Sequence, residues 1–226
     1  MRFRQQCDIS TKVARLAAIV ALAALAWGSA ALATPPAEVV ISPAEPGAWQ
    51  EQAFVGHTLY RVEDGGRGKA LRAIADGSAS ALCRTIQLDL KTLPIVRWSW
   101  RLDRPPPPRD ERRREGDDQG LRVSFLHRGG TTADSILAVQ YVWSQNEPRE
   151  AGWANAFVPN AHEVAARSGP GRPGTWVDEE RDLEADFRAA FGQDIDRVDA
   201  VCIMTDGDQG GALVEGWYGD IILKAR

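Results

Sequence analysis

The sequence is poor in the residues that carry most catalytic and metal chemistry: 226 residues contain three histidines, three cysteines and two methionines. The histidines at 57, 127 and 162 stand apart, without the spacing of a zinc site. No nucleophile elbow, catalytic cysteine signature or phosphate-binding glycine loop occurs. No motif therefore signals an activity, and we expect no cofactor. A glycosidase, however, needs only two carboxylates at the right separation, which a sequence does not show.

Long apolar runs are absent beyond the first 33 residues. There, four basic residues precede the apolar segment Leu16–Trp27, and Ala31-Leu32-Ala33 has the small-x-small pattern of a signal-peptidase site. The alternative is an uncleaved anchor, but the strictly apolar part is short for a membrane span. We predict a signal peptide over 1–33, cleavage near Ala33, and a periplasmic or secreted mature protein without a transmembrane span. A flexible segment, 34–47, would precede a single domain, 48–226.

A basic surface is also missing. Removal of residues 1–33 takes away four basic residues and one acidic residue, so the net charge falls from −4 to −7. Nucleic-acid binding usually needs a basic face, so we expect no nucleic acid as a partner.

Two cysteines remain after cleavage, Cys83 and Cys202. In an oxidising compartment they could form a disulfide. The alternative is two small buried side chains, because the sequence does not show whether the Cα atoms come close enough.

Alternation of apolar and polar residues is the dominant pattern, and clusters of Gly, Pro, Asp and Ser interrupt it. There is no internal repeat. The pattern predicts strands at 57–62, 69–74, 80–90, 95–102, 121–127, 135–143, 197–205 and 218–225. This indicates an all-β, two-sheet antiparallel β-sandwich of jelly-roll type.

One short helix is predicted near 182–191. Leu183, Phe187 and Phe191 fall on one apolar stripe, Asp182 can cap the N-terminus, and Gly192 can end the helix.

Residues 104–118, with four consecutive prolines and many charges, join two predicted strands, so we expect a long, solvated hairpin loop. If strands 95–102 and 121–127 pair, Arg101 lies opposite Arg122, and like charges there need an acid between them. Asp117 and Asp118 are the nearest candidates. The cluster is either a surface salt-bridge network or the polar floor of a binding groove.

Tryptophan is abundant, with eight residues. Alternation places Trp98 and Trp100 in the core, where they face the apolar side of strand 121–127. Trp143 and Trp153 flank a loop-like segment, so we expect them to be the exposed aromatic residues of a ligand site.

The segment "IMTDGDQGG" (203–211) ends a predicted strand with Asp206 and Asp208. A tight turn is the simplest interpretation. The pair could also contribute to a calcium site, with Asp220 or the Asp117–Asp118 pair as further ligands, or act as a catalytic carboxylate. The EF-hand pattern fails, because its twelfth position falls on Trp217.

The segments "PIVRWSWRL", "EERDLEADFRAAFG" and "VCIMTDGDQGG…GWYGDIIL" resemble the bacterial family called domain of unknown function 3047, over about residues 48–224. The resemblance implies an exported protein and assigns no catalytic residue. The strand order also resembles galactose-binding-like jelly rolls of carbohydrate-binding modules.

Three functional hypotheses follow. The first is an exported, non-catalytic domain that binds a glycan or another envelope ligand. The second is a glycan-active hydrolase or lyase that uses paired carboxylates, and the third is a structural interaction module of the envelope.

Overall fold

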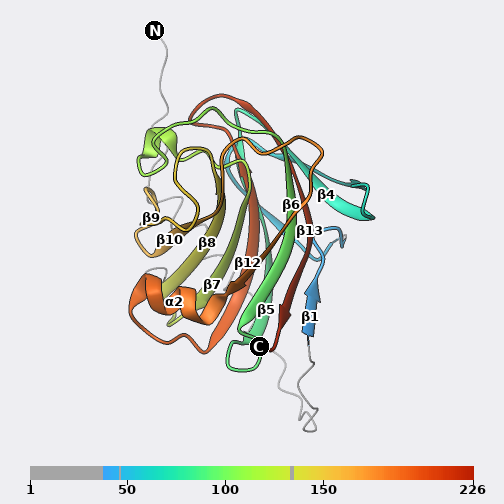
Figure 1. Cartoon of the computed structure of the whole chain (residues 1–226). Coiled ribbons are helices and arrows are strands. Elements are labelled where there is room, and N and C mark those ends of the chain that lie inside the picture. The colour runs from blue at the N-terminus through green and yellow to red at the C-terminus, as the bar shows by residue number, and fades with distance from the viewer. Residues whose placement is uncertain (1–37, 46, 133–134) are drawn as a thin grey trace.

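The structure, a computed structural model, describes residues 38–45, 47–132 and 135–226. They form two β-sheets packed face to face, with one α-helix at the edge of the sandwich (Figure 1). The expected signal peptide and its cleavage site lie outside the described residues. No helix in the described part of the chain is long and apolar enough to span a membrane.

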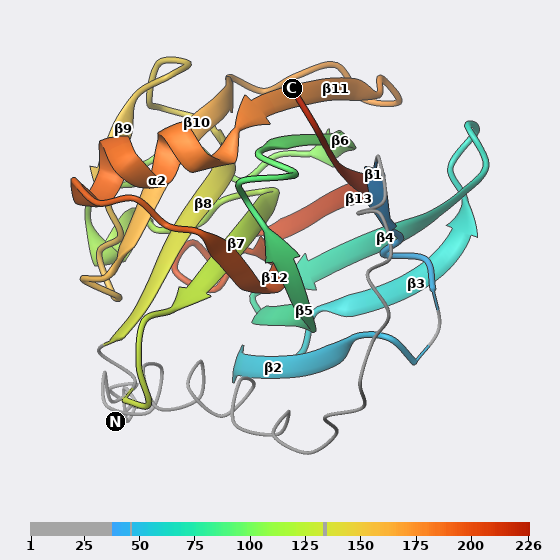
Figure 2. The ribbon, with the colours of Figure 1, turned by 90° about the horizontal axis from the view of Figure 1, so that it is seen from below.

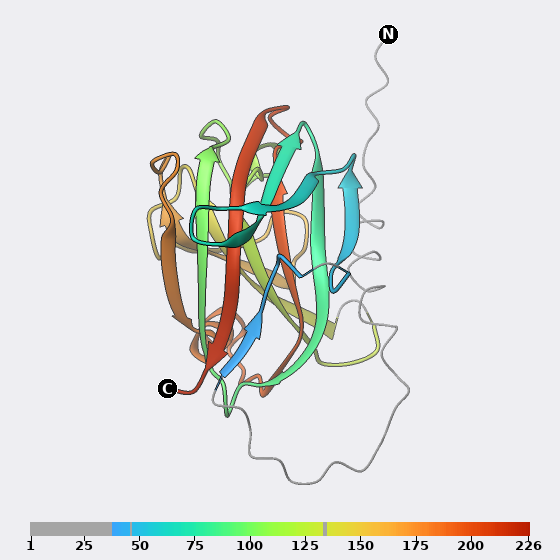
Figure 3. The same ribbon diagram turned by 90° about the vertical axis from the view of Figure 1, so that its right-hand side faces the viewer.

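Sheet A has six strands. Its order is β11 (Val177–Asp182), β6 (Ile95–Arg104), β13 (Leu213–Lys224), β4 (Lys69–Asp76) and β3 (Leu59–Asp64), and β1 (Glu38–Ile41) also pairs with β13. Figure 3 looks onto this sheet, with β13 running through its middle. Residues 38–41 therefore form a strand, although they belong to the segment that was expected to be flexible.

Sheet B has seven strands. Its order is β2 (Gln50–Val55), β5 (Ala79–Asp89), β12 (Arg197–Asp206), β7 (Arg122–Arg128), β8 (Ile136–Ser144), β10 (Ala161–Ser168) and β9 (Gly152–Ala154). Figure 2 shows this sheet from below, beside sheet A. The β8–β10 pair is parallel, whereas the other strand pairs of the described residues are antiparallel. The β-sandwich fold that alternation predicted is confirmed.

The core lies between the sheets, where the alternation predicts it. Trp98 and Trp100 of β6 are buried and share one hydrophobic cluster with Val123 and Phe125 of β7. The predicted contact between these two strand faces is therefore correct. However, the strands do not pair with each other: β6 belongs to sheet A and β7 to sheet B. The expected hairpin is wrong because the connecting loop carries the chain from one layer to the other.

The helix α2 spans Leu183–Phe191 and begins and ends as its sequence predicts. The Asp182 side chain accepts a hydrogen bond from the backbone N of Ala185, and Gly192 adopts a left-handed conformation with φ of 68°. Leu183 and Phe187 are buried in the core, so α2 covers one end of the sandwich near β8 (Figure 1).

Cys83 and Cys202 form a disulfide bond in this structure. They are directly opposite residues of β5 and β12, with a Cα–Cα distance of 4.1 Å. Alternation along β12 turns Cys202 away from the core residues Val201 and Ile203, so the bridge lies on the outer face of sheet B.

Candidate functional site

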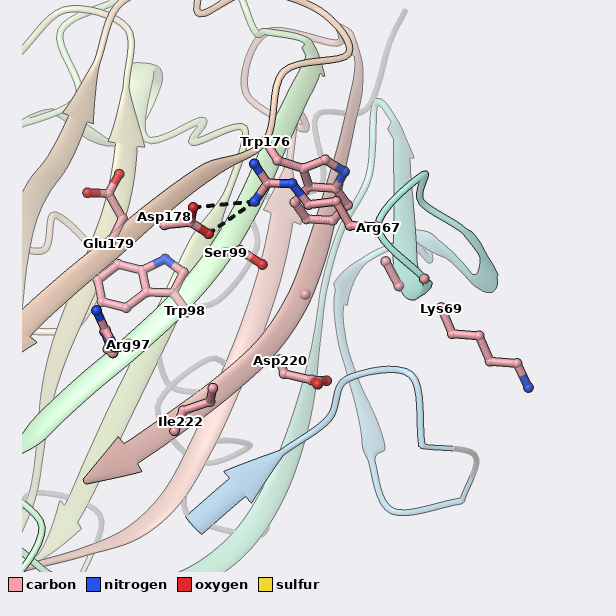
Figure 4. A pocket seen from close by; sticks show the side chains of 13 residues that line it. Arg67, Lys69, Arg97, Trp98, Ser99, Trp176, Asp178, Glu179, Asp220 and Ile222 are labelled. Atoms are coloured by element: carbon pink, nitrogen blue, oxygen red, sulfur yellow. Dashed lines mark hydrogen bonds and ion pairs between the residues drawn. The ribbon is translucent and has the colours of Figure 1, made fainter. Parts of the chain in front are cut away.

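An open pocket of about 460 Å³ lies on the outer face of sheet A (Figure 4). Four separate segments form it. They are the start of β4 with the turn before it, the middle of β6, the beginning of β11 and a bulge in β13. The polar and aromatic residues that line it are Arg67, Lys69, Arg97, Trp98, Ser99, Trp176, Asp178, Glu179 and Asp220.

The pocket exists because β13 bulges where it passes β6. The pairing register shifts between Tyr218 and Ile221, opposite the segment of β6 that contains Ser99. Gly219 occupies the bulge, and a Cβ atom there would lie 2.1 Å from the Ser99 Oγ atom. A side chain at position 219 would therefore force the Ser99 hydroxyl group to move. The bulge places Asp220 at the edge of the pocket (Figure 4).

The Trp176 indole is held in place by contacts with Gly65 and Arg101. Its Nε1 atom donates a 2.8 Å hydrogen bond to the Gly65 carbonyl, and a Cβ atom at Gly65 would lie 2.8 Å from the Trp176 Cζ2 atom. Arg101 donates to the same carbonyl, and its Cζ atom lies 5.5 Å from the Trp176 ring centroid and 4.3 Å from that of Trp217. An indole held in this way offers its surface to a ligand with little loss of side-chain entropy.

The charged groups of the pocket are mostly exposed. Arg67 Nη1 lies 3.2 Å from Asp178 Oδ1, and Arg97 Nε lies 2.7 Å from Glu180 Oε2. Exposed pairs of this kind are weak, so ligand hydroxyls can compete for both partners. Asp220 makes no side-chain hydrogen bond or ion pair with another residue that the structure describes. The pocket therefore combines donors, acceptors and an aromatic face, with charges that largely balance.

Of the predicted cluster of Arg101, Arg122, Asp117 and Asp118, the structure brings together Arg122 and Asp117. Arg101, on sheet A, pairs with Asp103 at 2.9 Å. Arg122, on sheet B, lies 3.5 Å from Asp117. The two arginines do not face each other because their strands belong to different sheets.

The loop that joins them is not fully solvated either. Glu111 is 1% exposed and accepts a 2.6 Å hydrogen bond from the backbone N of Gln145. Burying this carboxylate requires such partners, which anchor the loop to the end of β8.

Trp143 and Trp153 are buried, so the expectation of exposed aromatic residues is wrong. Trp143 follows the inward alternation of β8 and donates from Nε1 to the Gly169 carbonyl at 2.8 Å. Trp153 packs against Val142 and Ala165 on the outer face of sheet B. Both lie on strands rather than in the loop between them.

Asp118, Asp206 and Asp208, which we call the three-aspartate cluster, each place a carboxylate oxygen within 4.8 Å of the others. They could hold a metal ion. Asp118 also fixes the turn, accepting hydrogen bonds from the backbone N atoms of Gln209 (3.0 Å) and Gly210 (2.6 Å). Burial and the nearby Asp208 raise the pKa of Asp206 well above its ordinary value, and burial raises the pKa of Asp118. The hydrogen bonds to Asp118 stabilise the turn that the sequence predicts.

The sequence gives no direct signal for the pocket residues Trp176, Arg67 and Asp178. None lies in a motif, and folding brings them together from distant segments. The single available signal was Gly219 inside an otherwise regular strand pattern, which is typical of a bulge or of a close approach.

A family model described as "Protein of unknown function (DUF3047)" matches residues 47–222. The chain belongs to this family. Comparison with curated proteins finds no match. Among solved structures, the DUF3047 chain is similar to the family 30 carbohydrate-binding module of the cellulosomal cellulase Cel9D-Cel44B of Clostridium thermocellum. The identity is 11%, the coverage 84% of this chain and 98% of that chain, and the TM-score 0.51.

The chain is also similar to the endoglucanase Cel12A from Rhodothermus marinus, at 13% identity and a TM-score of 0.43. The alignment covers 81% of this chain and 98% of that chain. At these identities the likeness to the carbohydrate-binding module shows the fold alone, which is the predicted jelly-roll sandwich, and the endoglucanase likeness carries no argument.

Proposed function

We propose that the protein is an exported, non-catalytic domain that binds a neutral glycan in the pocket around Trp176. One observation carries this proposal: a rigidly held indole stands beside hydroxyl, carboxylate and guanidinium groups in an open pocket. Sugar rings present apolar C–H faces and hydroxyl groups that both donate and accept hydrogen bonds. The pocket offers a partner for each.

The balance of charge supports a neutral ligand. Arg67 and Arg97 each have a carboxylate partner, and Asp220 and Lys69, which also line the pocket, add one charge of each sign. A strongly anionic ligand would be repelled by the carboxylates of the pocket, and a strongly cationic ligand would be repelled by its cations. A neutral oligosaccharide would replace exposed ion pairs with hydroxyl contacts at little cost.

The test is calorimetric titration of the mature protein with neutral, uronic and amino oligosaccharides. Trp176→Ala is expected to abolish binding of the neutral members. Gly65→Ala is expected to weaken it about tenfold, because the added methyl group displaces the indole. Asp220→Asn is expected to weaken binding, whereas the matched control Asp76→Asn, on an exposed position of β4, is not. Unchanged affinity in Trp176→Ala would contradict the proposal.

A glycan-active hydrolase is the second candidate, because Glu163 and Asp206 are buried carboxyl groups with raised pKa values, as general acids often are. Analysis of the same titration mixtures for shortened oligosaccharides separates the two. Binding without product supports the binding domain, and product formation supports the hydrolase. If neither binding nor product is detected, an interaction module of the envelope is favoured.

A further inference from the structure

The strand β3 lies at one border of sheet A, and no strand of the described residues pairs with its other edge (Figure 2). Native sheets usually cover, shorten or charge such an edge, because its free backbone groups can pair with another strand. Leu59 and Val62 of β3 are 45% and 40% exposed, and they are two of the four large apolar residues that are exposed in the described part of the chain. This edge therefore combines free backbone groups with apolar surface.

The turn at the tip of the β3–β4 hairpin shows which backbone groups are free. The Gly65 N atom donates to the Gly68 carbonyl at 2.8 Å, so these two residues form a hydrogen-bonded pair. In an antiparallel ladder such pairs alternate with pairs that exchange no hydrogen bond. The β3–β4 register has no shift, so Tyr60, Val62 and Asp64 direct their N–H and C=O groups away from β4.

A second copy of this chain can add its own β3 to this edge in antiparallel orientation. The free backbone groups at 60, 62 and 64 must then oppose one another, which leaves three registers around the middle of the strand. One of them opposes Arg61 to Arg61 of the second copy, and another opposes Glu63 to Glu63 of the second copy. Like charges directly opposite each other destabilise a sheet. The remaining register opposes Val62 to Val62 and each Arg61 to the Glu63 of the other copy, so the charge pattern selects it.

The side chains complement one another in this register. Arg61 makes no ion pair or side-chain hydrogen bond within the part of the chain that the structure describes. Glu63 lies 3.3 Å from Arg72, which also has Glu215 at 2.7 Å, so the Glu63 carboxylate can be shared with a second cation. On the other face of the strand, the two copies of Val62 cover each other's apolar surface.

We propose that β3 is the edge through which two copies of this protein associate, with the two-fold axis beside Val62. Tyr60 of each copy exchanges backbone hydrogen bonds with Asp64 of the other, and the two Val62 residues do the same. The contact is isologous, so it closes as a dimer. A pairing of two short strands buries less surface than the roughly 1,000 Å² of a stable interface, so the dimer is weak and forms at high protein concentration.

The symmetry places both pockets on one side of the dimer. Opposed residues of antiparallel strands point to the same face of a sheet, so the two-fold axis is normal to the joined sheet. The outer faces of the two A sheets therefore look in the same direction, each with a pocket around Trp176. Simultaneous use of both pockets rests on the proposed function, whereas the association of the edges does not.

The experiment is sedimentation velocity of the mature protein, without glycan, between about 5 μM and 500 μM, the range in which weak complexes dissociate. The sedimentation coefficient of the wild type is expected to rise with concentration towards that of a dimer. Arg61→Glu and Glu63→Arg each oppose like charges twice across the axis, so each is expected to raise the dissociation constant at least tenfold. An equimolar mixture of these two variants restores opposite charges at both positions, so it is expected to associate within about threefold of the wild type.

A second pair of variants keeps the test decisive if a charge reversal prevents folding. Val62→Asp places two carboxylates at the axis and is expected to abolish association. The matched control Val40→Asp, at a 51% exposed position of β1, is expected to associate as the wild type does. A wild type that stays monomeric at the highest concentration would overturn the proposal and would show that Arg61 and Glu63 protect the edge instead. Association that is unchanged in Val62→Asp, or a mixture that associates no more than its separate components, would overturn it as well.

Discussion

Replacing Glu163 with glutamine is expected to stabilise the protein at alkaline pH and to change it little at acid pH. Burial raises the pKa of Glu163 from an ordinary 4.5 to about 8 in the folded state. Between these values the folded carboxyl group keeps a proton that the unfolded chain has lost. The stability that the protonated Glu163 carboxyl group contributes is therefore complete below pH 4.5 and is lost as the pH rises through 8.

The magnitude follows from the width of this window. Each pH unit inside it lowers the free energy of unfolding by about 1.4 kcal/mol, which gives an upper bound of about 5 kcal/mol by pH 8. Glutamine has the same shape and does not ionise, so Glu163→Gln should recover about 3–5 kcal/mol at pH 8 to 9. Buried acids that do not interact with Glu163 contribute equally to the pH dependence of both proteins and cancel in the difference, whereas the nearby Asp117 does not.

Urea unfolding of the wild type and Glu163→Gln at pH 5, 7 and 9 measures this difference directly. Glu51→Gln, at an exposed position of β2, is the matched control and should follow the wild type. If the wild type and Glu163→Gln keep a constant difference from pH 5 to pH 9, Glu163 is ionised in the folded protein and the reasoning fails.

Three further predictions concern other parts of the chain. Replacing both Cys83 and Cys202 by alanine should lower the free energy of unfolding by about 3–5 kcal/mol, measured in urea, because the bridge closes a loop across 119 positions; an unchanged midpoint would contradict this. The melting temperature should be the same in millimolar calcium and in excess chelator, because the three-aspartate cluster already binds backbone N–H groups and calcium prefers six to eight oxygen ligands; a rise with calcium would show a metal site. Mass spectrometry of the protein exported by a bacterial host should find Thr34 at the N-terminus, and recovery of the full-length chain in the membrane fraction would contradict cleavage.

Local sequence patterns were sufficient to predict which faces of the strands are buried and where the helix begins and ends. Alternation places Trp98 and Trp100 in the core because one side of a sandwich strand is always buried, and Asp182 and Gly192 mark the ends of α2 through their own hydrogen-bonding and backbone preferences. Pairing partners were not predictable in this way. Neighbouring strands in the sequence, β6 and β7, lie in different layers, which no local pattern reveals.

Alternation of apolar and polar residues does not predict a strand made mainly of charged residues, and it does not predict the pocket. The strand β11 carries five charged residues in six, yet its Glu179 is 5% exposed because Trp100 Nε1 and Arg167 Nε donate to it. Such a partnership depends on the fold. The same holds for Trp176, whose position depends on the Gly65 carbonyl, 111 residues earlier in the chain.

The place of β13 in sheet A has a consequence for how the chain acquires its structure. This strand follows the other strands of sheet A along the chain, and it pairs with β6, β4 and β1. During synthesis, sheet A lacks its central strand until β13 has emerged, and these pairings bridge long stretches of chain, which slows folding. Sheet A is therefore expected to form only after β13 has been synthesised. Deleting the last twelve residues should leave a product that never becomes resistant to proteases.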